Sequence, residues 1–322
     1  MTQLGEAIDV GVFVSDDEKH SEATCPWHKK ADSESANPMD PQETDEDSHG
    51  SIPDNMGKKL GNNLKKAKED PPPAELVQIA YKAGAVLAFK AAGKNKRVQT
   101  YESVQTEIYD YKLQYAPHHL IPGNESLKGS EVLVYMGDDS VIQNYEPTEA
   151  SLIKTGKSIN YDVNAAENGV WLPSPYALSN SNKWPSQEGI EVILMRMGQV
   201  AVDQVESFKK AYVAASIETA GHRQFHMRHE KYSHKVQAIL NAMGDKINLL
   251  ATKCPVANDG KEEEKLDPPA GLKDKLNNLS SRLKTLLIGG IWRSPFFTDD
   301  LSAEYATGLQ RVRRSTRKFR VM

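Results

Sequence analysis

Histidines that could hold a metal ion or move a proton gather in two short segments of this sequence. The first segment, HHLIPGN, places His118 and His119 side by side before an apolar pair. The second, GHRQFHMRHEKYSHKV over residues 221–236, contains four of the nine histidines in the chain. Imidazole commonly binds divalent transition metals, and it is the side chain that ordinarily titrates near neutral pH. The chemistry to expect is metal binding beside proton transfer.

The second segment continues a helical apolar pattern, which predicts that some of its histidines share a face. Residues three and four apart are neighbours on a helix, so His222, His226 and His229 should line one stripe. As metal ligands, His229 is preferred, His226 comes next and His222 last. His234 should point elsewhere. The competing interpretation is an exposed polar stripe without a ligand.

The paired histidines follow residues typical of a strand, where successive side chains point to opposite faces. One of the two could then face a metal ion while the other faces a water molecule. The alternative is a pair of ordinary loop histidines. A third element, YDVNAAENGVWLP over 161–173, contains Asn168-Gly169, which alone is more often a turn than a site.

Taken in order, these pieces resemble the AHH group of the HNH/endonuclease VII superfamily, whose members are commonly toxin domains of bacterial interference systems. The resemblance covers about 105–242 and rests on APHHLIPG, YDVNAAENGVWLP and FHMRHEKYSHKV. Pro117 departs from the family name, which implies alanine directly before the pair. The segment between the first two motifs is also long, which indicates inserted structure.

The resemblance implies a ββα-metal nuclease core in which His119 is the general base and His118 a metal ligand. Asn168 would hold the site loop, either by fixing the His119 ring through a backbone contact or by touching the metal. The expected activity is metal-dependent hydrolysis of phosphodiester bonds in nucleic acid, with DNA favoured over RNA. The cofactor is a divalent ion: imidazole ligands suit zinc, magnesium prefers oxygen, and the choice stays open.

The charge distribution fits a polyanionic substrate. The net charge is −4, yet residues 1–55 carry 14 acidic residues against 3 lysines. The last twelve residues, RVRRSTRKFRVM, have six basic residues and no acid. Such a basic end suits nucleic acid, although a solvated or partner-docking tail is the alternative. The expected nucleic-acid contacts are Arg311, Arg313, Arg314, Arg317, Lys318 and Arg320.

The organisation of the chain predicts an α+β, mostly helical fold. Residues 15–72 are polar, rich in proline and poor in aromatics, which is typical of poorly ordered sequence. A β-hairpin should carry the histidine pair, with helices around it. We expect an acidic adaptor or tether at 1–72, a nuclease domain with a leading helix at 73–250, and a linker, amphipathic helix and basic tail at 251–322. The flanking helices are predicted at about 74–94, 189–220, 222–242 and 271–288.

TCPWHKK interrupts the polar N-terminal region. Its Trp and Pro favour a short docked segment, while His20, Cys25 and His28 offer zinc ligands as the lesser alternative, without an evident fourth ligand. Cys25 and Cys254 are the only cysteines, too few for a disulfide framework, which favours folding in a reducing cytoplasm.

Several function classes are disfavoured. HExxH is absent, which argues against a zincin protease, and neither a Walker A nor a GxGxxG phosphate motif occurs. No apolar stretch approaches the roughly 20 residues of a membrane helix, and the acidic start is not a Sec signal.

We therefore expect a protein that is cytoplasmic in its producer and reaches target cells through a separate delivery or adaptor protein, type VI secretion being one route. A cognate immunity protein would protect the producer. The alternatives are a non-catalytic module that binds metal and nucleic acid, and a metallohydrolase acting on another substrate.

Overall fold

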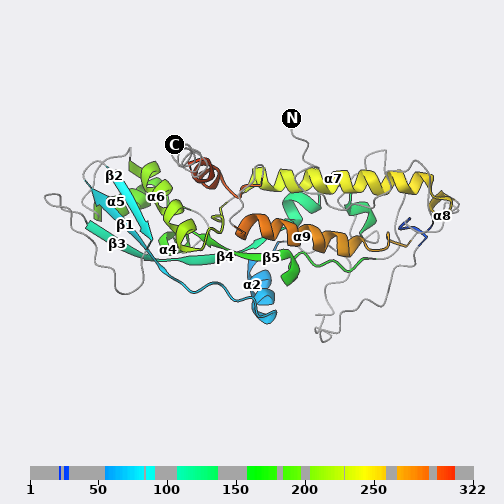
Figure 1. The fold of residues 1–322 in the computed structure, drawn as a ribbon, viewed down its shortest axis with the longest axis horizontal. Helices are drawn as coiled ribbons and strands as arrows, with labels where there is room; N and C mark the ends of the chain where they lie inside the picture. The colour runs from blue at the N-terminus through cyan, green and yellow to red at the C-terminus, as the bar shows by residue number, and fades with distance from the viewer. Residues whose placement is uncertain are drawn as a thin grey trace, which may run out of the picture. The chain divides into compact units, whose positions relative to one another are not determined.

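The protein is mostly helical, with small antiparallel sheets, as the predicted α+β class requires. It is described by a computed structural model, shown in Figure 1. The described residues are 22, 25–28, 55–82, 85–90, 107–136, 158–179, 184–196, 204–227, 229–258, 267–289 and 296–308. The chain divides into two compact units, each built from three segments. One unit comprises Met1–Asn63, His119–Gly169 and Ser233–Leu283, and the other Leu64–His118, Val170–Tyr232 and Lys284–Met322.

A three-stranded antiparallel sheet in the second unit replaces the helix predicted at 74–94. Its strands are β1 (Leu76–Lys82), β2 (Ala85–Lys90) and β3 (Glu107–Lys112), in the order β2-β1-β3. Strands β1 and β2 pair antiparallel from the Val77–Lys90 pair to the Lys82–Ala85 pair. The helix prediction was wrong because cross-strand pairing, which local spacing does not reveal, outweighs a weak helix propensity.

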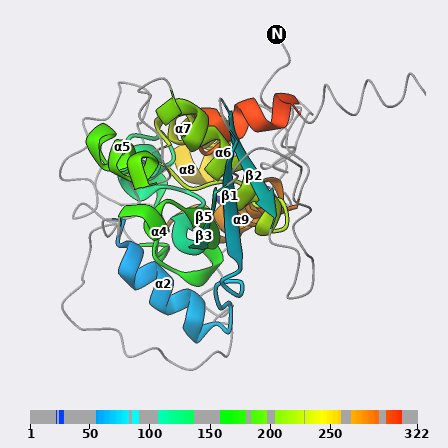
Figure 2. The ribbon, with the colours of Figure 1, turned by 90° about the vertical axis from the view of Figure 1, so that its left-hand side faces the viewer.

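Helices cover this sheet and form the core of the second unit. They include α4 (Tyr176–Ser179), α5 (Gln187–Arg196) and α6 (Gln204–Thr219). Helices α5 and α6 confirm the described parts of the helical pattern predicted at 189–220, whereas 197–203 lie outside the described residues. Helix α6 packs against β1 and β2, as Figure 2 shows. Fully buried side chains, among them Phe208, Tyr212 and Phe225, join this helix to Val77 of the sheet and to Leu113 beyond it.

A second, two-stranded sheet carries the histidine pair, so the predicted strand is confirmed, but its partner strand comes from far along the chain and the two do not form the predicted hairpin. Its strands are β4 (Gln114–His119) and β5 (Gly169–Ser174). Every residue of β5 is buried, and the buried positions of β4 include both histidines. The pair therefore lies on a strand whose partner is anchored in the protein interior.

Long helices dominate the first unit. Helix α7 (Glu230–Lys253), drawn in yellow in Figure 1, is followed by α8 (Pro255–Asn258) and α9 (Leu272–Ile288). Helix α9 confirms the helix predicted at 271–288. Short helical turns also belong to this unit: η1 (Gly123–Leu127), η2 (Leu133–Tyr135) and η3 (Ala166–Asn168).

The N-terminal region contains a helix that the sequence did not indicate. Helix α2 (Gly57–Lys66) lies inside the segment 15–72 that was expected to be poorly ordered. Leu60 and Leu64 are one turn apart and fully buried, so this short stretch does bury apolar surface although its mean composition is polar. None of the helices in the described ranges has the length and apolarity needed to cross a membrane.

Candidate metal centre and the adjoining histidine

Three imidazoles meet in the second unit. His118, His226 and His229 each place a ring nitrogen so that the three atoms lie within 4.8 Å of one another. The ring centroids of His118 and His229 are 4.7 Å apart, and those of His118 and His226 are 5.1 Å apart. His118 and His226 are buried, and His229 is half-buried. Nitrogen ligands at such spacing could hold one divalent ion.

His226 and His229 are not on a helix, so the prediction that they share one helix face is wrong. Helix α6 ends in a pair of bonds typical of a glycine stop: His222 N–H donates to Ile217 O at 2.8 Å, and Gly221 N–H donates to Glu218 O at 3.4 Å. Gly221 has a φ of 67°, which suits glycine. The sequence pattern continued across this glycine, whereas the chain turns there and resumes a helix only with α7.

Strand β5 holds the turned segment in place. His226 N–H donates to Pro173 O at 2.7 Å, and the Arg223 guanidinium donates to Trp171 O at 3.2 Å. His226 is thereby fixed beside the strand that pairs with the strand of His118. The assembly of the three imidazoles thus depends on sheet pairing and not on helical phase.

The remaining histidines of the 221–236 segment stand apart from this group. His222 has a φ of 66°, and its Nε2 lies 4.0 Å from a carboxylate oxygen of Glu218. It is exposed and does not join the three imidazoles. His234 is exposed on α7, in line with the expectation that it points elsewhere. Tyr232 is fully buried, with its ring centroid 5.1 Å from that of His118, so it forms one wall of the group.

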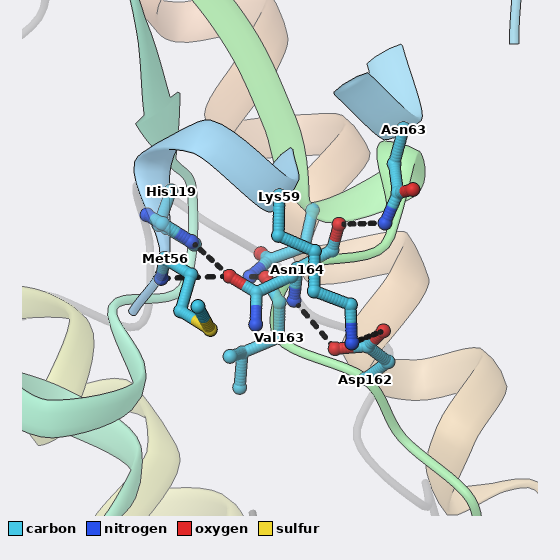
Figure 3. Close-up of polar contacts among 8 residues, drawn as sticks. Met56, Lys59, Asn63, His119, Asp162, Val163 and Asn164 are labelled. Carbon is cyan, nitrogen blue, oxygen red and sulfur yellow. Dashed lines mark hydrogen bonds and ion pairs between the residues drawn. The ribbon is translucent and has the colours of Figure 1, made fainter. Parts of the chain in front are cut away.

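His119 belongs to the first unit, where Asn164 fixes its ring (Figure 3). Its Nε2 lies 3.0 Å from Asn164 Oδ1, and the backbone N–H of Met56 donates to the same oxygen at 2.9 Å. A backbone N–H can only donate, so the atom that it meets must be the amide oxygen. His119 Nε2 must then carry a hydrogen and donate it, which leaves the lone pair on Nδ1 when the ring is neutral.

Asn164 is itself fixed by its neighbours. Its backbone N–H donates to Asp162 Oδ1 at 2.8 Å, and its carbonyl accepts from Asn63 Nδ2 at 2.8 Å. Figure 3 shows these bonds around the fully buried Asn164, with Lys59 paired to Asp162 at 3.5 Å. Burial lowers the pKa of His119, while the bond to Asn164 acts in the opposite direction. The neutral, Nε2-protonated ring is therefore the favoured form.

Asn168 ties down the loop that follows the histidine pair. Its Oδ1 accepts from Ile121 N–H at 2.8 Å and from the Ser280 hydroxyl at 3.0 Å. Its Nδ2 donates to Ile121 O and Val163 O, both at 2.9 Å. An amide has two donors and two acceptor sites, so these four bonds use its full capacity. Asn168 therefore holds the loop, but neither of the two finer roles considered for it is seen: the His119 ring is bonded by Asn164, and the four bonds leave Asn168 no lone pair for a metal ion.

Asn164 was missed because YDVNAAENG contains two asparagines and only the Asn-Gly dipeptide has a recognisable turn signature. The six basic residues expected to contact nucleic acid, between Arg311 and Arg320, lie outside the described residues, as does His20. No protein-family model, curated protein or solved structure matches this chain.

Proposed function

We propose that this protein is a metal-dependent nuclease that hydrolyses phosphodiester bonds, with DNA favoured over RNA as substrate. The observation that supports this most directly is that ring nitrogens of His118, His226 and His229 lie within 4.8 Å of one another. His118 is on strand β4, and the next residue of that strand is His119. Phosphodiester hydrolysis requires charge stabilisation on the phosphate and a base for the attacking water, and these residues offer both.

The donor set fits a transition metal better than magnesium. Three imidazole nitrogens are ligands of intermediate softness, which zinc, manganese and related ions accept, whereas magnesium selects oxygen and retains its waters. Three protein ligands with a position left over is also the pattern of catalytic zinc sites. When bound, the ion would act as a Lewis acid that stabilises negative charge on the phosphate oxygens.

His119 is the proposed general base. The Asn164 oxygen holds its proton on Nε2, so Nδ1 can accept a proton from water, and the imidazolium that results keeps its bond to Asn164. Asn164 acts here as a positioning residue. Replacing it with Leu should lower kcat by about 10–100-fold, the effect of removing the partner that orients a site histidine. Asn164→Asp should restore much of the rate, because a carboxylate oxygen also accepts from Met56 and His119.

A nicking assay tests the proposal. Full-length protein would be incubated with supercoiled plasmid and Zn²⁺, Mn²⁺ or Mg²⁺, with and without EDTA. We expect metal-dependent nicking that falls at least about 10²-fold in His119→Ala, the usual contribution of a general base. His229→Ala should lose both metal affinity and nicking, whereas the matched control His234→Ala should keep both. Absence of metal-dependent nicking by the wild-type chain on DNA and on RNA would reject the nuclease assignment.

One observation favours a second candidate, a non-catalytic module that binds metal and nucleic acid. His118 and Tyr232 are fully buried, and a metal ion held deep among such side chains could serve stability alone. The two candidates differ in one measurement. A structural ion would raise the melting temperature and leave the plasmid intact, whereas the nuclease would nick it.

The biological setting is proposed from the resemblance to interference toxins. An antibacterial nuclease endangers its producer, so a cognate immunity protein is the expected partner, and a separate adaptor would deliver the chain to target cells. The basic residues at 311–320 would add contacts to the phosphate backbone of the substrate, on the basis of their charge.

A further inference from the structure

A second group of metal-ligand side chains lies in the first unit, built from segments far apart in the sequence. Cys25, His28 and Cys254 place two sulfur atoms and one ring nitrogen within 4.8 Å of one another. Cys25 is 2% exposed and Cys254 is fully buried, while His28 is half-buried. Both cysteines of the chain are present as free thiols in this one group.

The fold brings these residues together through specific contacts. Residues 25–28 form a turn in which His28 N–H donates to Cys25 O at 3.3 Å. This spacing, with two residues between the ligands, lets both side chains reach one ion. Cys254 lies between α7 and α8, where its N–H donates to Ala251 O at 3.1 Å.

Two further contacts dock the turn against the rest of the unit. Ala270 N–H donates to Pro26 O at 3.1 Å, just before α9. The Trp27 ring packs edge-on against Tyr135, with centroids 6.1 Å apart and Trp27 only 8% exposed. The positions of Cys25 and His28 are therefore fixed by these contacts within the folded unit.

We propose that Cys25, His28 and Cys254 form a zinc site that fastens the N-terminal turn to the end of α7. Two thiolates and an imidazole are the ligands of structural zinc sites, and sulfur ligands exclude magnesium and calcium. The three residues leave one position of a tetrahedron for solvent or a further side chain. The site is chemically separate from the all-imidazole group, which contains no sulfur.

The ion would join the turn at 25–28 to Cys254, which directly follows the C-terminal end of α7. Zinc bound to the folded state and not to the unfolded chain adds its binding free energy to the stability of the fold. Removing the ion should therefore loosen the attachment of residues 25–28 without altering the imidazole group. A disulfide between the two cysteines is the competing outcome, because their thiols are close enough to belong to one group.

Cobalt substitution gives a direct test, because thiolate ligands produce charge-transfer absorption in the near ultraviolet that imidazoles do not. The full chain would be reduced, stripped of metal and titrated with Co²⁺. We expect added Co²⁺ to produce this absorption, and Zn²⁺ to displace the bound Co²⁺ and abolish the absorption. Cys25→Ser or Cys254→Ser should remove most of it. The matched control is the double variant His118→Ala, His229→Ala, which should keep the absorption even if its nuclease activity is lost.

The result is informative even if a cysteine variant fails to fold, because the wild-type titration stands alone. Reduced wild-type protein that shows no thiolate absorption with Co²⁺ would overturn the proposal. So would an air-purified chain whose cysteines resist alkylation until a reductant is added, since that identifies a disulfide. A zinc-dependent rise in melting temperature that persists in the control variant and disappears in His28→Ala would support it.

Discussion

Asn168 makes four hydrogen bonds at the loop after the histidine pair, so replacing it should have a large effect on stability. Asn168→Ala removes four hydrogen bonds and deprives buried backbone groups of Ile121 and Val163 of their partners. One intramolecular hydrogen bond contributes about 0.5–1.5 kcal/mol net, so four give about 2–6 kcal/mol. Because buried groups are left unpaired, we expect a loss of about 4 kcal/mol in the free energy of unfolding.

An isosteric variant tests the orientation of the amide. Asn168→Asp puts a carboxylate oxygen where Nδ2 now faces the carbonyl oxygens of Ile121 and Val163. Burial and these carbonyls should raise the pKa of the new carboxyl in the folded state above the unfolded value of about 3.9. The folded state then binds the proton more tightly than the unfolded state. The stability deficit of this variant should shrink as the pH falls from neutral toward that value.

Urea unfolding followed by tryptophan fluorescence measures both effects. The matched control is Ser280→Ala, which removes one of the four bonds and should lower the free energy of unfolding by about 1 kcal/mol. If Asn168→Ala cost no more than Ser280→Ala, the amide would not be making the bonds described. A deficit of Asn168→Asp that did not change with pH would refute the assigned orientation of the amide.

Three further predictions concern parts of the molecule outside the imidazole group. Gly244→Ala would place a Cβ 2.6 Å from the backbone of Glu131 and should destabilise by about 1–3 kcal/mol in urea unfolding, whereas Gly308→Ala meets open space and should not. Burial raises the pKa of Asp299 from 3.8 to about 6, so this carboxyl contributes stability that is lost as the pH rises through that range. Thermal melts should accordingly show the melting temperature of Asp299→Asn rising relative to that of wild type as the pH is raised from 3.8 to about 6. Deleting 311–322 should flatten the salt dependence of nucleic-acid binding, by about one log–log unit per lost phosphate contact, when Kd is measured on a His119→Ala background.

Helices with a long, uninterrupted apolar pattern could be predicted from the sequence, as α6 and α9 illustrate. The hairpin of β1 and β2 could not, because its residues are spaced like a helix and β3, which pairs with β1, comes later in the chain. Helix α2 was missed for a different reason. A whole-segment composition is dominated by polar residues and conceals two leucines one turn apart.

The candidate site, too, could be predicted from the sequence only in part. His226 and His229 were chosen by helical phase, which is absent, yet both reach His118 because β5 anchors the turned segment. Residue type therefore identified the histidines that meet, whereas helical spacing did not describe how they meet. The contribution of Cys254 to the second group had no local signal at all, since its partners Cys25 and His28 lie near the other end of the chain.

The alternation of the chain between its two units bears on how such a protein can be inherited and engineered. Six segments alternate, so the backbone passes from one unit to the other five times, once between His118 and His119 themselves. Neither unit corresponds to a continuous stretch of coding sequence. A single recombination crossover cannot transplant one unit intact into another protein, and a truncated clone would carry fragments of both. Exchange between relatives should therefore favour crossovers near the ends of the chain, which keep the two interleaved units together.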